Sequence, residues 1–135
     1  MHSTRKVKDD LIYVGGSDRR LSRFENLFPI PKGVSYNSYV LLDEKTVLFD
    51  TADESISRQY IENVVHALNG RPLDYMVVQH MEPDHCAMID DMLRRYPEAK
   101  MVCSAKRSAC MPSSTERTLP RVRWSSRKAT SCPRA

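Results

Sequence analysis

The chain has 135 residues, a formal net charge of +4 and 41% hydrophobic residues, which fit a single globular domain of modest size. It holds no run of about 18 or more apolar residues, so the sequence predicts no membrane span and no membrane partner. The charged N-terminus lacks the apolar core of a secretory signal. We therefore expect a cytoplasmic protein with four reduced thiols, Cys86, Cys103, Cys110 and Cys132.

The charge is unevenly distributed along the chain. Residues 1–105 hold 13 Lys and Arg against 16 Asp and Glu, a net charge of −3, whereas residues 106–135 hold 8 against 1, a net charge of +7. The second part is rich in Ser, Arg and Pro and buries too little apolar surface to offset an ordering cost of roughly 1–2 kcal/mol per residue. We predict a folded domain over residues 1–109 and a disordered basic tail over residues 110–135. This tail holds one tryptophan and no recognisable nucleic-acid-binding motif, so we do not expect nucleic acid as a partner.

The first predicted elements are strands. The β-prone run 11–14 ends at a pair of glycines, and residues 17–33 form a charged segment that we expect to be a long ordered loop. Residues 35–42 and 46–49 are β-prone and are separated by a turn of hairpin length, which predicts two adjacent antiparallel strands. The apolar anchors expected for the loop are Leu21, Phe24, Leu27, Phe28 and Ile30.

The clearest predicted helix covers residues 56–68, where apolar residues recur at helical spacing. Asp53 or Ser55 can cap its start, and Gly70 stands where a left-handed residue ends a helix. A β-prone run over residues 73–78 follows.

The remaining elements alternate in the same way. We predict a loop from Gln79, a helix over residues 87–96 and a strand over residues 101–103. Strands alternating with helices in this order predict an α/β fold.

Four metal-ligating side chains lie within six residues, just after the predicted strand 73–78. They are His80, Glu82, Asp84 and His85. Imidazole and carboxylate groups both bind metals when deprotonated, and two of each without a nearby thiolate pair suit iron or manganese at least as well as zinc. In an extended loop His80, Glu82 and Asp84 would point the same way, whereas Asp84 and His85 would serve different sides, which favours two metals over one. Asp50 lies at the end of a strand, and we expect its carboxylate to form a hydrogen bond that orients a ligand histidine.

Several segments of the sequence resemble the N-terminal part of flavodiiron proteins, also called A-type flavoproteins or flavorubredoxins. The resemblance covers about residues 7–109. Ordinary hydrolases of the metallo-β-lactamase fold have a histidine where this chain has Glu82, so Glu82 points to the diiron branch. The segments that carry the resemblance are Asp18–Val34, Ser35-Tyr-Asn-Ser-Tyr39, Val47-Leu-Phe-Asp-Thr51 and Val78-Gln-His-Met-Glu-Pro-Asp-His85.

The resemblance implies the first half of a four-layer αββα sandwich of the metallo-β-lactamase type. It also implies an oxidoreductase that reduces O₂ to water, nitric oxide to nitrous oxide, or both, at a non-haem diiron site. His80 and Glu82 would bind one iron, and Asp84 and His85 the other. In the full-length family, electrons come from a rubredoxin-like donor or from FMN in a flavodoxin-like domain, across a homodimer.

Three departures from the family pattern are visible. No histidine follows His85, no aspartate follows Asp91, and no flavodoxin-like segment is present, although the family uses further ligands downstream. We hypothesise a shifted reading frame or a truncated gene near Ala109, and we expect little or no turnover from this chain alone, with no catalytic residue of its own. A non-catalytic iron-binding oxygen sensor or subunit, a zinc hydrolase of the same fold and an inert fragment stay open as alternatives.

Overall fold

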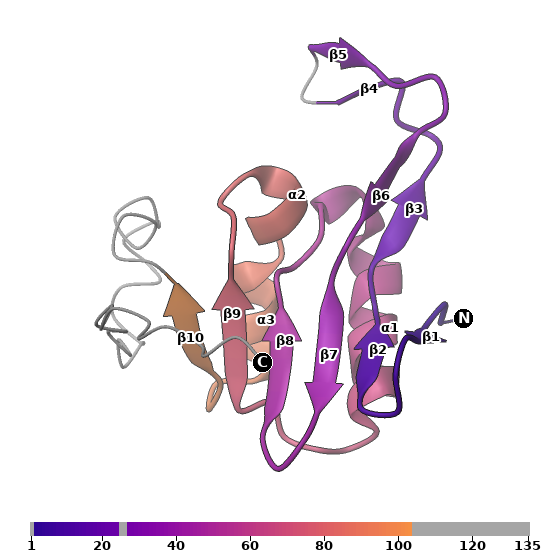
Figure 1. Cartoon of the computed structure of the whole chain (residues 1–135). Coiled ribbons are helices and arrows are strands. Elements are labelled where there is room, and N and C mark those ends of the chain that lie inside the picture. Colours follow the sequence, from indigo (N-terminus) through magenta and orange to yellow (C-terminus); the bar gives the residue numbers. More distant parts are fainter. Residues whose placement is uncertain (1, 25–26, 104–135) are drawn as a thin grey trace, which may run out of the picture.

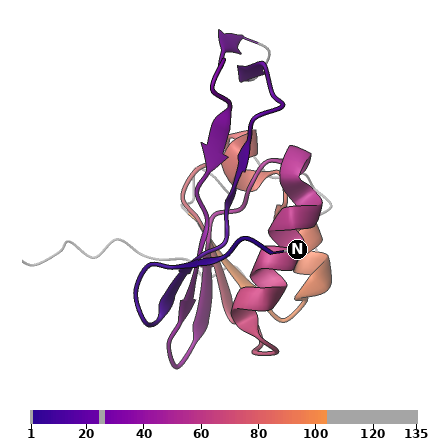
Figure 2. The ribbon, with the colours of Figure 1, turned by 90° about the vertical axis from the view of Figure 1, so that its right-hand side faces the viewer.

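The computed structural model describes residues 2–24 and 27–103, which build one mixed six-stranded sheet with its long helices on one face (Figures 1 and 2). The spatial order of the strands is β1-β2-β7-β8-β9-β10. Their bounds are β1 Arg5–Lys6, β2 Leu11–Tyr13, β7 Tyr39–Leu42, β8 Thr46–Phe49, β9 Tyr75–Val78 and β10 Lys100–Cys103. The predicted α/β fold and the predicted antiparallel pair of β7 and β8 are confirmed.

The helices connect the parallel part of the sheet. Strand β8 pairs in parallel with β9, and β9 in parallel with β10, so each connection must cross over the sheet. The first crossover consists of the 3₁₀ helix η1, Glu54–Ile56, and helix α1, Ser57–Leu68; the second contains the short helix α2, Pro83–Cys86, and helix α3, Ile89–Arg95. The described residues contain no helix long and apolar enough to cross a bilayer.

The caps of the first crossover agree with the sequence. The side chain of Asp53 accepts a hydrogen bond of 2.8 Å from the backbone N–H of Ser55 and so begins η1. Gly70 has the predicted left-handed backbone, with φ of 84°, and Asn69 before it shares this conformation, with φ of 46°.

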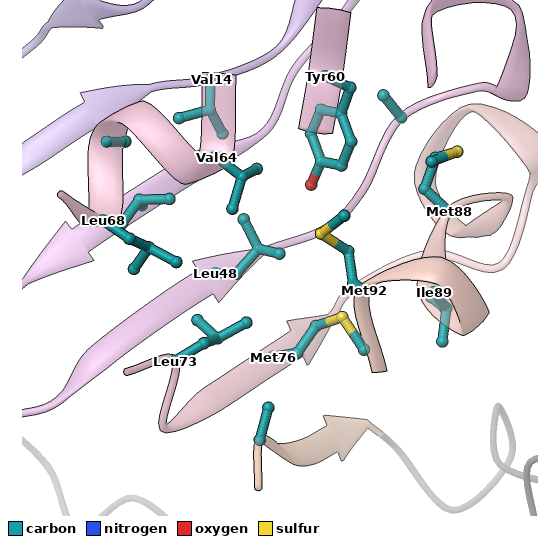
Figure 3. Packing of buried hydrophobic residues seen from close by; sticks show 14 of the residues in the cluster. Val14, Leu48, Tyr60, Val64, Leu68, Leu73, Met76, Met88, Ile89 and Met92 are labelled. Atoms are coloured by element: carbon teal, nitrogen blue, oxygen red, sulfur yellow. The ribbon is translucent and has the colours of Figure 1, made fainter. Parts of the chain in front are cut away.

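The hydrophobic core lies between the sheet and the helices. Val40, Leu48 and Met76 are directly opposite one another on β7, β8 and β9, and all three are fully buried. Figure 3 shows that Leu48 and Met76 face side chains of α1 and α3. The other large side chains that complete this cluster include Tyr60, Val64, Leu68, Met88 and Met92.

The opposite face of the sheet is apolar as well, although both long helices lie on the other side (Figure 2). A sheet with one face in water normally alternates apolar and polar side chains, so an apolar second face indicates a surface that packs against something. The strand register makes two continuous rows of half-buried side chains on this face, called the open face because none of the described helices covers it. One row is Tyr13, Tyr39, Phe49, Val77 and Val102, and the other is Leu11, Leu41, Val47 and Tyr75.

We expect the 135-residue chain to self-associate through this open face. Replacing Val47 and Val77 together with threonine should weaken dimerisation on the order of a hundredfold, because both subunits carry both changes and each change removes roughly 0.8 kcal/mol of apolar burial. Sedimentation velocity over a concentration series measures the effect. Val65→Thr is the matched control, since Val65 is 39% exposed on helix α1. A monomer at every concentration would contradict the prediction.

Two parts of the structure differ from the prediction for residues 17–42. The expected long loop contains strand β3, Gly16–Asp18, and a hairpin of β4, Arg23–Phe24, and β5, Phe28–Pro29, which projects away from the sheet (Figures 1 and 2). The expected single strand 35–42 is divided, because β6, Val34–Tyr36, leaves the main sheet and pairs with β3. The predicted tail, residues 110–135, lies outside the described residues.

Candidate metal centre

The predicted ligands gather at the carboxyl ends of the neighbouring parallel strands β8 and β9, where open α/β sheets place their sites (Figure 1). His80 and Glu82 lie in the segment that leaves β9, whereas Asp84 and His85 lie on helix α2. The sequence did not reveal α2, because four residues are too short to show a helical period. Pro83 occupies its first turn, where the fixed φ of proline suits a helix start.

The structure brings the four side chains together as two histidine–carboxylate pairs. His80 Nε2 lies 2.9 Å from Glu82 Oε1, and His85 Nε2 lies 3.4 Å from Asp84 Oδ2. The two imidazoles meet edge to face, with ring centroids 5.4 Å apart. These contacts do not test the iron ligation that the resemblance implies, which stays a prediction.

The donor set suits a cation. Asp84 Oδ1 is buried and has no hydrogen-bond partner among the described residues. An unpartnered buried carboxylate oxygen costs free energy, and a bound cation would offset that cost. Imidazole nitrogen and carboxylate oxygen are the donors that non-haem iron accepts. Over residues 2–24 and 27–103, however, no three such side chains converge on one point as a complete metal site.

Asp50 orients His85, as the sequence predicted. Its Oδ2 lies 3.1 Å from His85 Nδ1, and its Oδ1 accepts a hydrogen bond of 2.6 Å from the backbone N–H of Gln79. The carboxylate of Asp50 is therefore held between strands β8 and β9 and helix α2. When Nδ1 of the neutral imidazole donates to Asp50, Nε2 is left free to bind a metal.

Thr51 fixes the backbone of the same histidine. Its N–H and its hydroxyl both donate to the carbonyl of His85, each at 2.8 Å, and its oxygen accepts from the N–H of Met88 at 3.3 Å. Sequence reasoning did not identify Thr51. No local pattern signals a contact between residues 34 positions apart.

Cys86 packs beside the centre as a thiol. Its Sγ donates to the carbonyl of Met81 at 3.1 Å, and the residue packs against the core. Burial, with the negative charge of Asp84, raises the pKa of this thiol above its usual range. It therefore stays protonated at neutral pH. Cys103 is also half-buried and forms no disulfide within the described residues, whereas Cys110 and Cys132 lie outside them.

A sequence profile of one domain family matches most of the chain. The profile is described as ODP family beta lactamase, and it matches residues 34–127. The match extends past Ala109, the predicted end of the folded domain. That boundary lies outside the described residues and stays a prediction.

Curated relatives and solved structures agree with the profile. The anaerobic nitric oxide reductase flavorubredoxin of Klebsiella pneumoniae is 33% identical over 100 residues, which are 73% of this chain and 21% of the relative. That of Aliivibrio fischeri is 35% identical over 102 residues, again 21% of the relative. The chain thus spans about a fifth of the length of these relatives.

Two solved structures share the fold. Rubredoxin oxygen:oxidoreductase from Desulfovibrio gigas superposes with a TM-score of 0.76 at 29% identity, covering 84% of this chain and 28% of that one. The flavodiiron protein from Giardia intestinalis gives 0.73 at 22% identity, covering 79% and 26%. The β-lactamase-like fold predicted from the sequence is confirmed.

Proposed function

This chain belongs to the ODP family of beta-lactamase-like domains, as the N-terminal part of such a domain in flavodiiron proteins, and we propose that it carries part of a non-haem diiron site. The proposal extends to the reaction of an oxidoreductase that reduces nitric oxide to nitrous oxide, O₂ to water, or both. The names of the relatives, a nitric oxide reductase and an oxygen:oxidoreductase, support both substrates.

The proposed roles follow the two pairs of side chains. His80 and Glu82 would hold one iron, and Asp84 and His85 the other. When bound, the irons would supply the binding positions and the redox chemistry for the diatomic substrate. Electrons would come from a rubredoxin-like or flavin donor, as the names flavorubredoxin and rubredoxin oxygen:oxidoreductase suggest. The family resemblance further implies a homodimer.

One observation supports the metal site most strongly. Asp84 Oδ1 is buried without a partner, whereas the neighbouring His85 is fixed on both sides, by Asp50 at its ring and by Thr51 at its carbonyl. A side chain that is held rigidly beside an unpartnered carboxylate oxygen is prepared for a cation, since this one imidazole needs no further ordering on binding. Ions can reach His85 from the solvent, because 28% of its side chain is accessible.

The test is anaerobic loading of the 135-residue chain with Fe(II), followed by desalting and iron analysis. We expect at least one iron per chain to be retained. Less than one would contradict the proposal. Loading with Zn(II) is the comparison, because hydrolysis of a β-lactam or a thioester by the zinc-loaded chain would favour a hydrolase of the same fold instead.

A further inference from the structure

Asp50 has an unusual backbone for a residue with a side chain. Its φ is 54°, in the left-handed region, and only 4% of its surface is exposed. This conformation costs roughly 1–2 kcal/mol for an L-residue, although Asp tolerates it better than most. Of the described non-glycine residues, only Asn69 shares it, and Asn69 ends helix α1. Such a conformation persists where the surroundings determine it.

Two buried hydroxyls meet the backbone of Asp50. Ser38 Oγ donates to the carbonyl of Asp50 at 3.0 Å, and the Tyr60 hydroxyl lies 3.3 Å from the same oxygen. The two hydroxyls are 3.1 Å apart, and both residues are fully buried. On the other side of the residue, the N–H of Asp50 donates to Val77 at 2.8 Å. The peptide groups on both sides of Asp50 are therefore fixed.

These hydroxyls come from distant parts of the fold. Ser38 lies directly before strand β7, and Tyr60 lies on helix α1, whose buried face covers the sheet (Figure 3). Burial raises the pKa of the Tyr60 phenol above its usual range, so this group remains a hydrogen-bond donor at all ordinary pH values. When the Tyr60 hydroxyl donates to Ser38 Oγ, and Ser38 Oγ donates to the Asp50 carbonyl, each hydroxyl proton makes one hydrogen bond.

The carbonyl that the two hydroxyls bind belongs to the same residue that orients His85. Asp50 is the residue whose carboxylate meets Nδ1 of His85 at 3.1 Å. A rotation of the Asp50 backbone would swing this carboxylate away from the imidazole. Thr46 offers a contrast, because its buried hydroxyl also bonds a carbonyl, that of Pro72, but at the opposite end of β8.

We propose that Ser38 and Tyr60 are positioning residues for the metal centre. They hold Asp50 in its left-handed conformation, aim its carboxylate at Nδ1 of His85 and so leave Nε2 as the metal-binding nitrogen. The hydrogen bonds of the two hydroxyls go to one another and to the carbonyl of Asp50, and not to His85. The proposal deepens the proposed function, since it rests on His85 being a ligand.

The first measurement uses the metal-free protein. Imidazole ¹⁵N shifts report which nitrogen of His85 carries the proton, and we expect the Nδ1–H form to dominate in the wild type. Ser38→Ala and Tyr60→Phe should each lower its fraction. Asp50→Asn should lower it most, because the amide oxygen keeps the hydrogen bond from Gln79 and the amide NH2 then replaces the carboxylate oxygen that faces Nδ1. Thr46→Val is the control, because it also loses a buried hydroxyl and should leave the His85 tautomer unchanged.

The second measurement is the affinity for Fe(II) alone, by anaerobic titration. Loss of a hydrogen-bond partner of a ligand costs roughly 10–100-fold in affinity, so Ser38→Ala and Tyr60→Phe should weaken binding about tenfold, and Thr46→Val should not. Wild-type tautomer and affinity in both variants would overturn the proposal. If the wild type binds no iron, the proposed function fails, while the tautomer fractions still decide whether Ser38 and Tyr60 position His85.

Discussion

Leu48→Ala should destabilise the fold by about 2–5 kcal/mol, as the loss of a fully buried leucine leaves a cavity in the core. Leu48 is completely inaccessible to solvent and lies on β8, between Val40 and Met76. A small domain is stable by about 5–15 kcal/mol in total, so this change removes a large share of it. Denaturation by urea, followed by circular dichroism, should show a much lower midpoint or no cooperative transition.

The control for this prediction is Leu27→Ala. Leu27 is the same residue type but is 70% exposed on the projecting hairpin of β4 and β5, so we expect a change within about 0.5 kcal/mol. Equal losses in the two variants would contradict the position of the core between sheet and helices.

The hydrophobic pattern predicted the elements that depend on local periodicity. Helix α1 and strand β8 begin and end within about one residue of the prediction, because an amphipathic period and a short turn are local properties of the chain. The spatial order of the strands was not predicted. That order depends on pairing between segments far apart in the chain, such as Lys100 with Tyr75, which no local pattern records.

The hairpin of β4 and β5 shows where hydrophobicity alone gives a wrong prediction of burial. Phe28 and Leu27 were expected to anchor a loop, but they are 62% and 70% exposed. An apolar residue is buried only where the surrounding backbone brings a partner to it, and this hairpin extends away from the sheet. The expectation was wrong for these two residues, whereas Leu21, Phe24 and Ile30 are half-buried.

The candidate site, too, could be predicted from the sequence only in part. Its four candidate ligands are close together in the sequence, so residue types and spacing were enough to propose them. The contact of Asp50 with a histidine followed from its place at a strand end and is confirmed. The supporting groups were missed. Ser38, Tyr60 and Thr51 act through contacts 12, 10 and 34 positions away, and their residue types are common in any core.

His85→Ala should weaken iron binding more than any change to a supporting residue, hence by more than the roughly 10–100-fold expected when a ligand loses its partner. The variant removes the imidazole that faces Asp84 and Asp50. It keeps the backbone carbonyl that accepts two hydrogen bonds from Thr51, so helix α2 retains its attachment to β8. Anaerobic Fe(II) titration measures the affinity, and circular dichroism measures the stability.

His66→Ala is the matched control for this loss. His66 is exposed on helix α1, where its ring contacts Thr4 and stacks on His2. We expect unchanged iron affinity in this variant. Equal affinities for His85→Ala and the wild type would exclude His85 as a ligand. A loss of affinity with an unchanged unfolding midpoint would assign the effect to the missing ligand, because the Thr51 hydrogen bonds keep the local fold independent of the imidazole.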